Sequence, residues 1–551
     1  MAVVLGINAV FHDPAAALVV DGRVVAAAEE ERFSRRKHGK IAVPFSTWEL
    51  PERAIAFCLD AAQVGAQDLD AIAYSYDPDL VGERPGLCDD GWEQLRTLYA
   101  REAPGFLRSV IGRFDADRFR WVPHHHAHAA SAYLAAPFAQ SDVMVLDGRG
   151  ERGSALFGSY RSGTFEVLAT QRLPHSLGLL YEELTVHLGF QRSSDEYKVM
   201  ALASYGRPRF LADLRRAIVH DGSGGFCAGP LAFAQLAPPR AAGEDFEEAH
   251  ADLAASVQRR LEEVILDLAA WLHGRTGCPD LTIAGGVGLN CVANSRLWAE
   301  GPYEHVWVQP AAGDAGTALG AALLTASSLG DPVVPMTTAA LGPSWDDEEI
   351  EQVLVKARVP FSRPTDLAAA VAGRLSTGAI VGWYEGRSEF GPRALGHRSL
   401  LADPRDRSNL ERLNDVKGRE QFRPVAPIVL AERAGEIFDG PLPSPYMLFV
   451  HRVREDWRHR IPAVVHVDGT ARAQTVDRAE EPRIAALLDA FGARTGVPVL
   501  VNTSFNTAGR PMVDSPNDAL ELFGSAPLEL LVLGPFVVDR RSFAGAAGPD
   551  Q

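Results

Sequence analysis

Two neighbouring stretches decide the fold and its chemistry, Val122-Pro-His-His-His-Ala-His128 and Val143-Met-Val-Leu-Asp-Gly-Arg-Gly150. Four of the sixteen histidines lie in the first stretch. If it is helical, His124 and His128 lie four residues apart on one face, where two neutral imidazoles can chelate a divalent metal. Asp147 ends an apolar run that predicts a buried strand, so its carboxylate is a reasonable third ligand. A histidine-rich helix start without a metal is the alternative, but the clustering beside a strand-end Asp-Gly favours a metal site.

The chain repeats one arrangement of an apolar strand, a polar glycine-containing turn and a hairpin. The copies are Val3–Val10 with 15–20 and 23–28, and Val143–Leu146 with 155–160 and 164–169. Asp21-Gly22 in the first hairpin is a strong two-residue turn signal. The repetition predicts a duplicated α/β unit.

A glycine loop follows the second copy at Leu281–Asn290, between a predicted strand and a predicted helix. Gly285 and Gly286 let backbone N–H groups approach a phosphate, and the helix start adds a favourable dipole, so this loop with Asn290 is a candidate nucleotide-binding segment. An amphipathic helix is predicted before it, over 252–273. Together with the two copies, the loop indicates a nucleotide cleft of the actin–hexokinase type.

Asp314 lies in a Gly-flanked turn before a predicted helix over 317–326. It is either a helix cap or a fourth metal ligand from the opposite half of the cleft. Residues 330–344 are rich in Pro, Gly and Thr and predict a linker. We therefore expect two domains, 1–335 and 346–551, as a chain of 551 residues is too long for one ordinary core.

Arginines gather among glycines in the second domain, within Trp383–Ser399 and after it. Guanidinium groups on glycine-rich turns suit a phosphate pocket better than a solvated charged face. The strand beginning at Val499 opens into amide and hydroxyl side chains that form a second wall. The residues predicted to line this anion pocket are Arg393, Arg398, Lys417, Arg423, Asn502, Ser504 and Asn506.

Composition limits the class of protein. A formal net charge of −17 disfavours a nucleic-acid surface. No apolar stretch is long enough to span a membrane, and the start does not read as a signal peptide. Five scattered cysteines form neither a disulfide framework nor a paired motif. We expect a cytoplasmic protein without nucleic-acid or membrane partners, with a homodimer left open.

The ordered motifs resemble the carbamoyltransferase family of nodulation protein U, cephem carbamoyltransferase and tobramycin carbamoyltransferase. The matching stretches are 11–17, 29–39, 124–133, 147–150, 198–203, 284–290, 391–399, 423–427 and 502–506. The resemblance implies an α/β protein, with α+β character in its C-terminal part. Its first domain would resemble the tRNA threonylcarbamoyladenosine ligase, on the actin–hexokinase fold, and its second would be YrdC-like.

The resemblance also implies a reaction. The second domain would turn carbamoyl phosphate and ATP, bound with Mg²⁺, into carbamoyl adenylate; the first would pass the carbamoyl group to an acceptor hydroxyl and release AMP. It implies Fe(II) as the ion, although imidazole with carboxylate suits Fe, Mn and Zn alike. The residues so implied are His124, His128, Asp147 and Asp314 as metal ligands, His12 and Lys37 at the transfer site, and Lys417, Arg423, Arg472 and Ser504 around carbamoyl phosphate and nucleotide.

The sequence leaves open the proton-accepting residue, the acceptor substrate and the class of enzyme. Either His12 or His125 could take the proton of the acceptor hydroxyl, whereas His126, where relatives usually carry an aliphatic residue, is off the ligand face. The acceptor is expected to be an antibiotic or sugar-containing natural product. A tRNA-modifying threonylcarbamoyl-type transferase and a sugar kinase are the rival enzymes; a zinc peptidase would need a glutamate between its helical histidines, and a non-enzymatic scaffold would leave both pockets without purpose.

Overall fold

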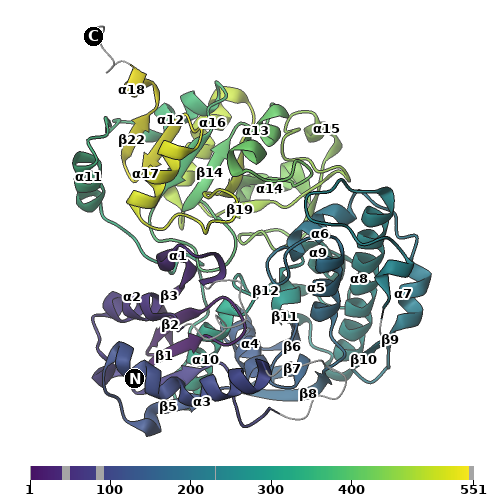
Figure 1. Cartoon of the computed structure of the whole chain (residues 1–551). Helices are drawn as coiled ribbons and strands as arrows, with labels where there is room; N and C mark the ends of the chain where they lie inside the picture. The colour runs from purple at the N-terminus through teal and green to yellow at the C-terminus, as the bar shows by residue number, and fades with distance from the viewer. Residues whose placement is uncertain (1, 40–49, 82–91, 230, 545–551) are drawn as a thin grey trace. The chain divides into compact units, whose positions relative to one another are not determined.

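The computed structural model describes residues 2–39, 50–81, 92–229 and 231–544. The chain forms two compact units, 1–341 and 342–551, and each is considered by itself (Figure 1).

The first unit is built on two five-stranded sheets with the same plan. One has the order β3-β2-β1-β4-β5 and the other the order β8-β7-β6-β11-β12. In each, an antiparallel hairpin is followed by two parallel strands. The strands are β1 Val3–Asn8, β2 Ala15–Val20, β3 Arg23–Glu29, β4 Ala71–Tyr74 and β5 Phe119–Trp121, then β6 Ser141–Leu146, β7 Gly153–Arg161, β8 Thr164–Arg172, β11 Asp280–Ala284 and β12 His305–Val308. The predicted duplication and both predicted hairpins are confirmed.

In each half of this unit, the helix after the last strand packs on the sheet of the other half. Helix α4 (His124–Tyr133) follows the last strand of the first sheet but packs on β6, β7 and β11 of the second. Helix α10 (Ala315–Ser328) follows the last strand of the second sheet but packs on β1, β2 and β4. The two helices also pack against each other, between the sheets (Figure 1). The segments that begin them, with their histidines and Asp314, therefore meet at the centre of the unit.

Small residues make this central contact possible. A Cβ on Gly320 of α10 would lie 1.8 Å from the carbonyl oxygen of Ala127 in α4. A Cβ on Gly6 of β1 would lie 1.9 Å from that of Ala318. Only glycine allows backbones to approach so closely, and the alanine-rich stretches of both helices fill the rest of the interface.

In the rest of the first unit, α2 packs on β2 and β3, α8 packs on β6 and β7, and α5, α6, α7 and α9 pack on α8. The predicted amphipathic helix is present as α8, which is longer than expected. A small hairpin, β9 (Ile218–His220) with β10 (Phe226–Ala228), packs on it. The helices are α1 Glu31–Ser34, α2 Glu52–Ala62, α3 Trp92–Ile111, α5 Leu177–His187, α6 Glu196–Ala203, α7 Leu211–Ala217, α8 Glu248–Thr276 and α9 Cys291–Glu300.

The second unit has a mixed seven-stranded sheet, in the order β19-β15-β20-β14-β13-β21-β22, with helices on both faces. One buried cluster lies under α12 and α16, and another lies under α11, α13, α14 and α17. The sheet strands are β13 Val381–Tyr384, β14 Arg398–Ala402, β15 Ala426–Leu430, β19 Gln474–Val476, β20 Val499–Ser504, β21 Leu530–Leu533 and β22 Phe536–Asp539; a three-stranded sheet holds β16 Phe438–Asp439, β17 His451–Val453 and β18 Thr470–Ala471. The helices are α11 Asp347–Lys356, α12 Leu367–Leu375, α13 Ser408–Lys417, α14 Ala431–Ile437, α15 Glu455–Arg458, α16 Pro482–Thr495, α17 Pro516–Ser525 and α18 Arg541–Ala544. The predicted α/β class is confirmed.

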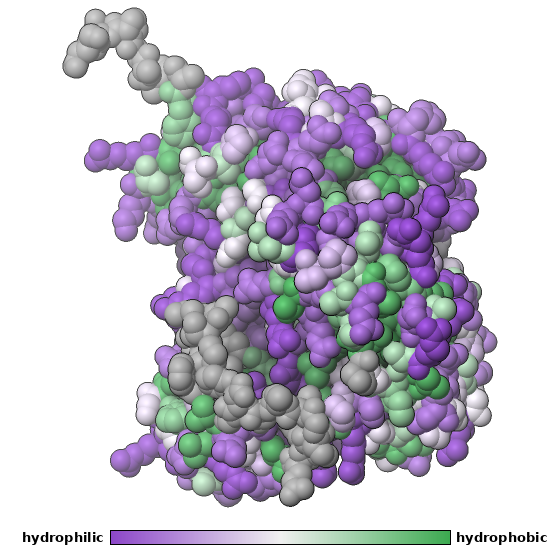
Figure 2. All heavy atoms as spheres, turned by 45° about the vertical axis from the view of Figure 1, so that its right-hand side comes forward, coloured by the Kyte–Doolittle hydropathy of each residue, from purple (hydrophilic) through white to green (hydrophobic). Residues whose placement is uncertain are grey.

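Among the described residues no helix is long and apolar enough to cross a membrane. On the face shown in Figure 2, hydrophilic side chains predominate, and hydrophobic ones lie among them in small groups.

Candidate active site

The histidine stretch forms the helix that the sequence predicts, and a carboxylate fixes its start. Pro123 at the N-cap offers no side-chain acceptor. Instead Glu151, buried just beyond Asp147-Gly-Arg-Gly, accepts the backbone N–H of His124 at 2.8 Å and that of Asp77 at 2.9 Å. Sequence reasoning missed Glu151; its place after a strand-end Asp-Gly motif was the available signal.

Two imidazoles and two carboxylates converge at this point. His124 Nε2 lies 3.3 Å from Asp147 Oδ2 and 3.7 Å from Asp314 Oδ1. His128 Nε2 lies 3.8 Å and 3.6 Å from the same two atoms. All four side chains are buried, and one ligand atom from each lies within 4.8 Å of the others. The structure therefore brings together the four predicted metal ligands.

Asp314 is not the helix cap that the sequence left as an alternative. It occupies the N-cap position of α10, yet its side chain caps no backbone N–H. The carboxylate faces the histidines of α4 instead. Because α4 and α10 come from opposite halves, the cluster joins the two halves of the unit.

The donor set fits a divalent ion. The Nε2 atoms of His124 and His128 are buried and make no hydrogen bond within the described residues, although buried polar nitrogens normally have a partner. Burial alone would raise the pKa of Asp147, but the close imidazoles of His124 and His125 and the charge of His128 hold that pKa well below its usual range. A backbone carbonyl, that of Ser75, lies 3.3 Å from His124 Nδ1 and turns Nε2 toward the cluster.

The glycine loop reaches the same cluster. Gly286 donates its N–H to Asp147 Oδ1 at 3.1 Å. Gly285 has a φ of +91°, and a Cβ there would lie 2.2 Å from the carbonyl oxygen of Leu146. Asn290 caps α9 by accepting the N–H of Ala293. In this structure the loop positions a ligand carboxylate, and its predicted role in nucleotide binding stays a prediction.

The predicted transfer-site residues differ in their surroundings. His12 is partly exposed, with Nε2 3.8 Å from Asp314 Oδ2 and Nδ1 2.9 Å from Asp13 Oδ2. His125 is buried, with Nε2 3.5 Å from Asp147 Oδ2. Lys37 does not bond to the cluster; its ammonium donates to Ser194 Oγ at 3.3 Å.

The His126 ring lies edge-on to Phe165, 6.4 Å between centroids. Within the described residues two groups of side chains could hold an ion, the four predicted metal ligands and a more exposed set of Asp13, Glu31 and His38, and His126 belongs to neither.

In the second unit, three of the predicted pocket residues form one cluster. Lys417, the last residue of α13, is buried and donates to the hydroxyl of Ser504 at 3.1 Å and to the carbonyl of Asn506 at 3.0 Å. Ser504 Oγ also lies 2.7 Å from Asn506 Oδ1. Arg423 follows on the loop after α13, with Nη1 3.4 Å from Glu420 Oε2. This arrangement fixes a polar turn at the end of β20.

Two other residues predicted to line the pocket are fully buried and hydrogen-bonded to neighbouring loops. Arg398 is fully buried over the ring of Tyr384 and donates only to backbone carbonyls, those of Pro343, Glu385, Gly386, His397 and Asp514. Asn502, also fully buried, donates to the carbonyl of Ala394 and to Gln474 Oε1. Both side chains hold loops in place, so the structure does not direct Arg398 at an anion as the sequence suggested.

The remaining two arginines, Arg393 and Arg472, lie close in sequence to Ala394 and Gln474, the two residues to which Asn502 donates. Arg393 lies in the turn before β14, and Arg472 precedes β19 with its Nε buried and without a hydrogen bond in the described part of the chain. Sequence reasoning missed Glu389. This buried carboxylate accepts the N–H groups of Leu395, His397 and Arg398 through Oε1, and its place before the Gly-Pro-Arg turn was the available signal.

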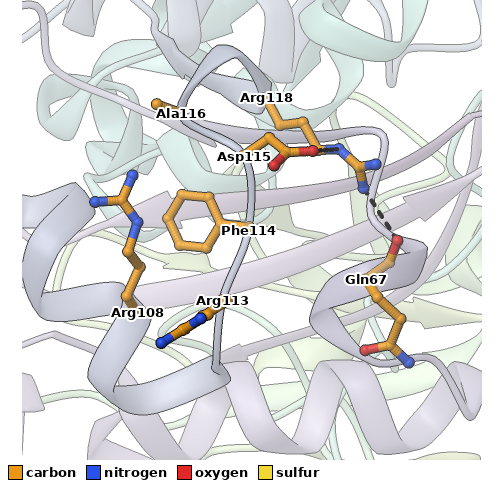
Figure 3. Close-up of a pocket in the computed structure, with 7 residues that line it drawn as sticks. All are labelled: Gln67, Arg108, Arg113, Phe114, Asp115, Ala116 and Arg118. Carbon is orange, nitrogen blue, oxygen red and sulfur yellow. Dashed lines mark hydrogen bonds and ion pairs between the residues drawn. The ribbon is translucent and has the colours of Figure 1, made fainter.

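A separate hollow of about 500 Å³ lies between the end of α3 and β5 (Figure 3). Arg118 lies on one side of it, donating to the Gln67 carbonyl at 3.0 Å and lying 3.7 Å from Asp115 Oδ2. Its lining residues are Gln67, Arg108, Arg113, Phe114, Asp115, Ala116 and Arg118. None of them was a predicted site residue, so the hollow is distinct from the candidate site.

Comparison with known proteins covers both units. The family model described as carbamoyltransferase N-terminus matches residues 3–116, 92–223 and 232–323, and that described as carbamoyltransferase C-terminus matches 372–540. Nodulation protein NolNO of Sinorhizobium fredii is 40% identical over 560 residues, 97% of this chain and 80% of its own. The uncharacterized protein sll1178 of Synechocystis is 37% identical, over 97% of this chain and 96% of its own. Nodulation protein U of Sinorhizobium fredii is 32% identical, over 93% of this chain and 95% of its own.

Proposed function

The chain belongs to the carbamoyltransferase family, and we propose that it is an ATP-dependent O-carbamoyltransferase acting on a hydroxyl of a small molecule. In the first step carbamoyl phosphate, ATP and one water give carbamoyl adenylate, phosphate and pyrophosphate. In the second step the acceptor oxygen bonds to the carbamoyl carbon, the bond to AMP breaks, and one proton is released. A carbamoyl group is a poor electrophile because its nitrogen donates into the carbonyl, so adenylation supplies the leaving group that the transfer needs.

The buried cluster in the first unit carries this proposal. Two imidazole nitrogens that have no hydrogen bond within the described part of the chain face two carboxylates, and all four side chains are buried. Such a set of donors would hold Fe(II), the ion that the resemblance implies, or another divalent metal. An ion held there would act as a Lewis acid on a carbonyl or phosphate oxygen. The four ligands are His124, His128, Asp147 and Asp314.

His12 is the better candidate for the base that takes the proton of the acceptor hydroxyl. Its side chain is 32% exposed, against 9% for His125. The Asp13 carboxylate accepts from Nδ1, which leaves Nε2 as the acceptor atom on the side of Asp314. This pairing would stabilise the imidazolium that forms when Nε2 takes a proton.

The second unit would carry out the activation step. Lys417 and Arg423 come from α13 and the loop after it, and Ser504 comes from the end of β20. Cations with hydroxyl and amide donors suit carbamoyl phosphate and the phosphates of ATP with Mg²⁺. The acceptor would be an antibiotic or a sugar-containing metabolite, and the reaction would take place in the cytoplasm, where ATP is available.

The direct test is to incubate the full chain with carbamoyl phosphate, ATP and Mg²⁺, and to assay pyrophosphate, AMP and ADP. The proposal expects pyrophosphate and AMP, and an acceptor mass gain of about 43 Da in a panel of hydroxyl compounds. ADP as the only nucleotide product would favour a sugar kinase, and transfer to tRNA would favour a threonylcarbamoyl-type enzyme.

The division of labour has its own test. Arg423→Ala should stop pyrophosphate release, whereas His128→Asn should leave it intact and stop transfer. Arg433→Ala, which removes an exposed arginine paired with Glu436, is the matched control and should do neither. Equal loss of both steps in the first two variants would contradict two separate sites.

A further inference from the structure

Ser194 and His38, which the proposed function does not use, form a line of hydrogen bonds with Asp13 in the first unit. Ser194 Oγ lies 2.9 Å from His38 Nε2, and His38 Nδ1 lies 2.8 Å from Asp13 Oδ1. A hydroxyl, an imidazole and a carboxylate in this order, at these distances, are the arrangement of a serine nucleophile with its general base and the group that orients the base.

Three distant segments build this line of hydrogen bonds, and all three have unusual backbone geometry. Asp13 follows β1, His38 lies in the turn after α1, and Ser194 precedes α6. The φ angles of Asp13 and His38 are +49° and +62°, and that of Ser193, beside the serine, is +54°. Left-handed conformations in non-glycine residues carry strain that persists where the surrounding structure enforces it, often at functional sites.

The hydrogen bonds set the roles of the three groups. An N–H at His38 Nδ1 donates to Asp13, so Nε2 is left to accept from the Ser194 hydroxyl. Burial alone would raise the pKa of Asp13, but the charges and hydrogen bonds of His38 and His12 hold it well below its usual range. Lys37 Nζ, 3.3 Å from Ser194 Oγ, would stabilise negative charge on that oxygen.

The hydrogen-bonded group of Ser194, His38 and Asp13 borders the transfer site. Asp13 uses its second oxygen to hold His12, whose Nε2 lies 3.8 Å from Asp314 Oδ2. The side chains of Asp13 and His38 are 28% and 26% exposed, so a substrate at this site can reach them.

We propose that Ser194 is a catalytic nucleophile that receives the carbamoyl group and forms an O-carbamoyl serine. This inference rests on the proposed function for the identity of the acyl donor. Ser194 Oγ bonds to the carbamoyl carbon of carbamoyl adenylate, the bond from that carbon to the phosphate oxygen breaks, and AMP leaves. His38 takes the hydroxyl proton and keeps it. In the second half, His12 takes the acceptor proton and releases it to solvent, the acceptor oxygen bonds to the carbamoyl carbon, and His38 returns its proton to the departing Ser194 oxygen.

A covalent intermediate has a clear chemical advantage here. Carbamoyl adenylate carries a good leaving group and is open to attack by water, whereas a serine carbamate is a poor electrophile and survives much longer. Ser194 would hold the activated group until an acceptor binds, and the two halves of the transfer would then follow ping-pong kinetics.

The first experiment treats the full chain with a fluorophosphonate probe, which reacts with activated serines independently of carbamoyl chemistry. We expect one label per chain at Ser194, lost in Ser194→Ala and His38→Gln and kept in Ser193→Ala, whose serine bonds to Glu182 instead. Absence of label at Ser194 in the wild-type protein would overturn the nucleophile assignment.

The second experiment incubates the protein with carbamoyl phosphate and ATP, without acceptor, followed by trypsin and mass spectrometry. The peptide of residues 193–198 should gain about 43 Da on Ser194, and Ser194→Ala should slow transfer by about 100-fold or more while adenylate formation continues. Transfer at the wild-type rate in Ser194→Ala would overturn the proposal and leave the proposed function standing. Fluorophosphonate labelling with no pyrophosphate or AMP from the wild-type chain would instead reject the proposed function, and with it the carbamoyl intermediate.

Discussion

Gly286 holds Asp147 by donating its backbone N–H to Oδ1 at 3.1 Å, while Oδ2 of the same carboxylate faces the histidines of α4. The glycine loop therefore fixes the orientation of the predicted metal ligand Asp147. Gly285 makes it possible, because its φ of +91° turns the chain over the end of β6. The loop after β11 thus orients the carboxylate at the end of the neighbouring strand.

Gly285→Ala should damage both stability and ion binding. The new Cβ would lie 2.2 Å from the carbonyl oxygen of Leu146, in a conformation that alanine rarely adopts. We expect a loss of about 2 kcal/mol or more in the free energy of unfolding, together with a lower metal content. Gly313→Ala is the control, because its Cβ would make only an ordinary contact with Leu289, at 3.7 Å. Urea denaturation and elemental analysis measure the two effects, and wild-type values in Gly285→Ala would refute the assignment.

His128→Asn should weaken metal binding by more than about 10-fold, because it replaces one imidazole of the cluster with a weaker, shorter ligand. His126→Asn changes the same residue type on the same helix, off the ligand face, and should keep about one ion per chain, as a single four-ligand site predicts. Plasma mass spectrometry of dialysed protein gives the ratio. Similar metal contents in the two variants would contradict the assignment of this cluster as the ion site.

The sequence predicts those features that depend on local spacing. The helical pair His124 and His128, the hairpin at Asp21-Gly22 and the duplicated plan all follow from periodicity and turn residues. Asp147 could also be placed, because it ends an apolar strand. These features were predictable because the residues that define each of them are close together in the chain.

Features that depend on distant partners could not be derived in this way. Asp314 begins a helix in sequence, and only the packing of α10 on α4 shows that its carboxylate faces histidines rather than capping. Arg398 appears in a glycine-rich arginine cluster, yet its guanidinium is satisfied by carbonyls from residues as far away as Asp514. Ser194 and His38 are separated by 156 positions, so no local pattern could pair them.

Gly320→Ala tests whether the contact between α4 and α10 supports the cluster. Its Cβ would lie 1.8 Å from the carbonyl oxygen of Ala127, so the two helices must separate. We expect the free energy of unfolding to fall by about 1–3 kcal/mol, the typical cost of overpacking in a closely packed core, and the metal content to fall with it. Gly274→Ala in α8 has open space around its Cβ and should stabilise the helix by about 0.5–1 kcal/mol. In calorimetry of the full chain, the melting temperature should therefore fall for Gly320→Ala and rise for Gly274→Ala.

Glu30→Gln should change how the stability of the first unit depends on pH. Glu30, at the N-cap of α1, is buried, and its Oε2 accepts the N–H groups of Arg53 and Ala54 at the start of α2. Burial raises the pKa of Glu30 to about 7, despite these hydrogen bonds, from an ordinary value of 4.5. Between those two values the folded chain keeps a proton that the unfolded chain releases, so stability falls as the pH rises through this window, by at most about 3 kcal/mol. Glutamine can accept the same hydrogen bonds without titrating, so Glu30→Gln should gain stability relative to wild type at pH 8 but not at pH 4. Urea denaturation at both pH values measures this. Glu52→Gln, which removes an exposed charge from the first turn of α2, is the control. Parallel pH profiles of stability for Glu30→Gln and wild type would contradict the assignment.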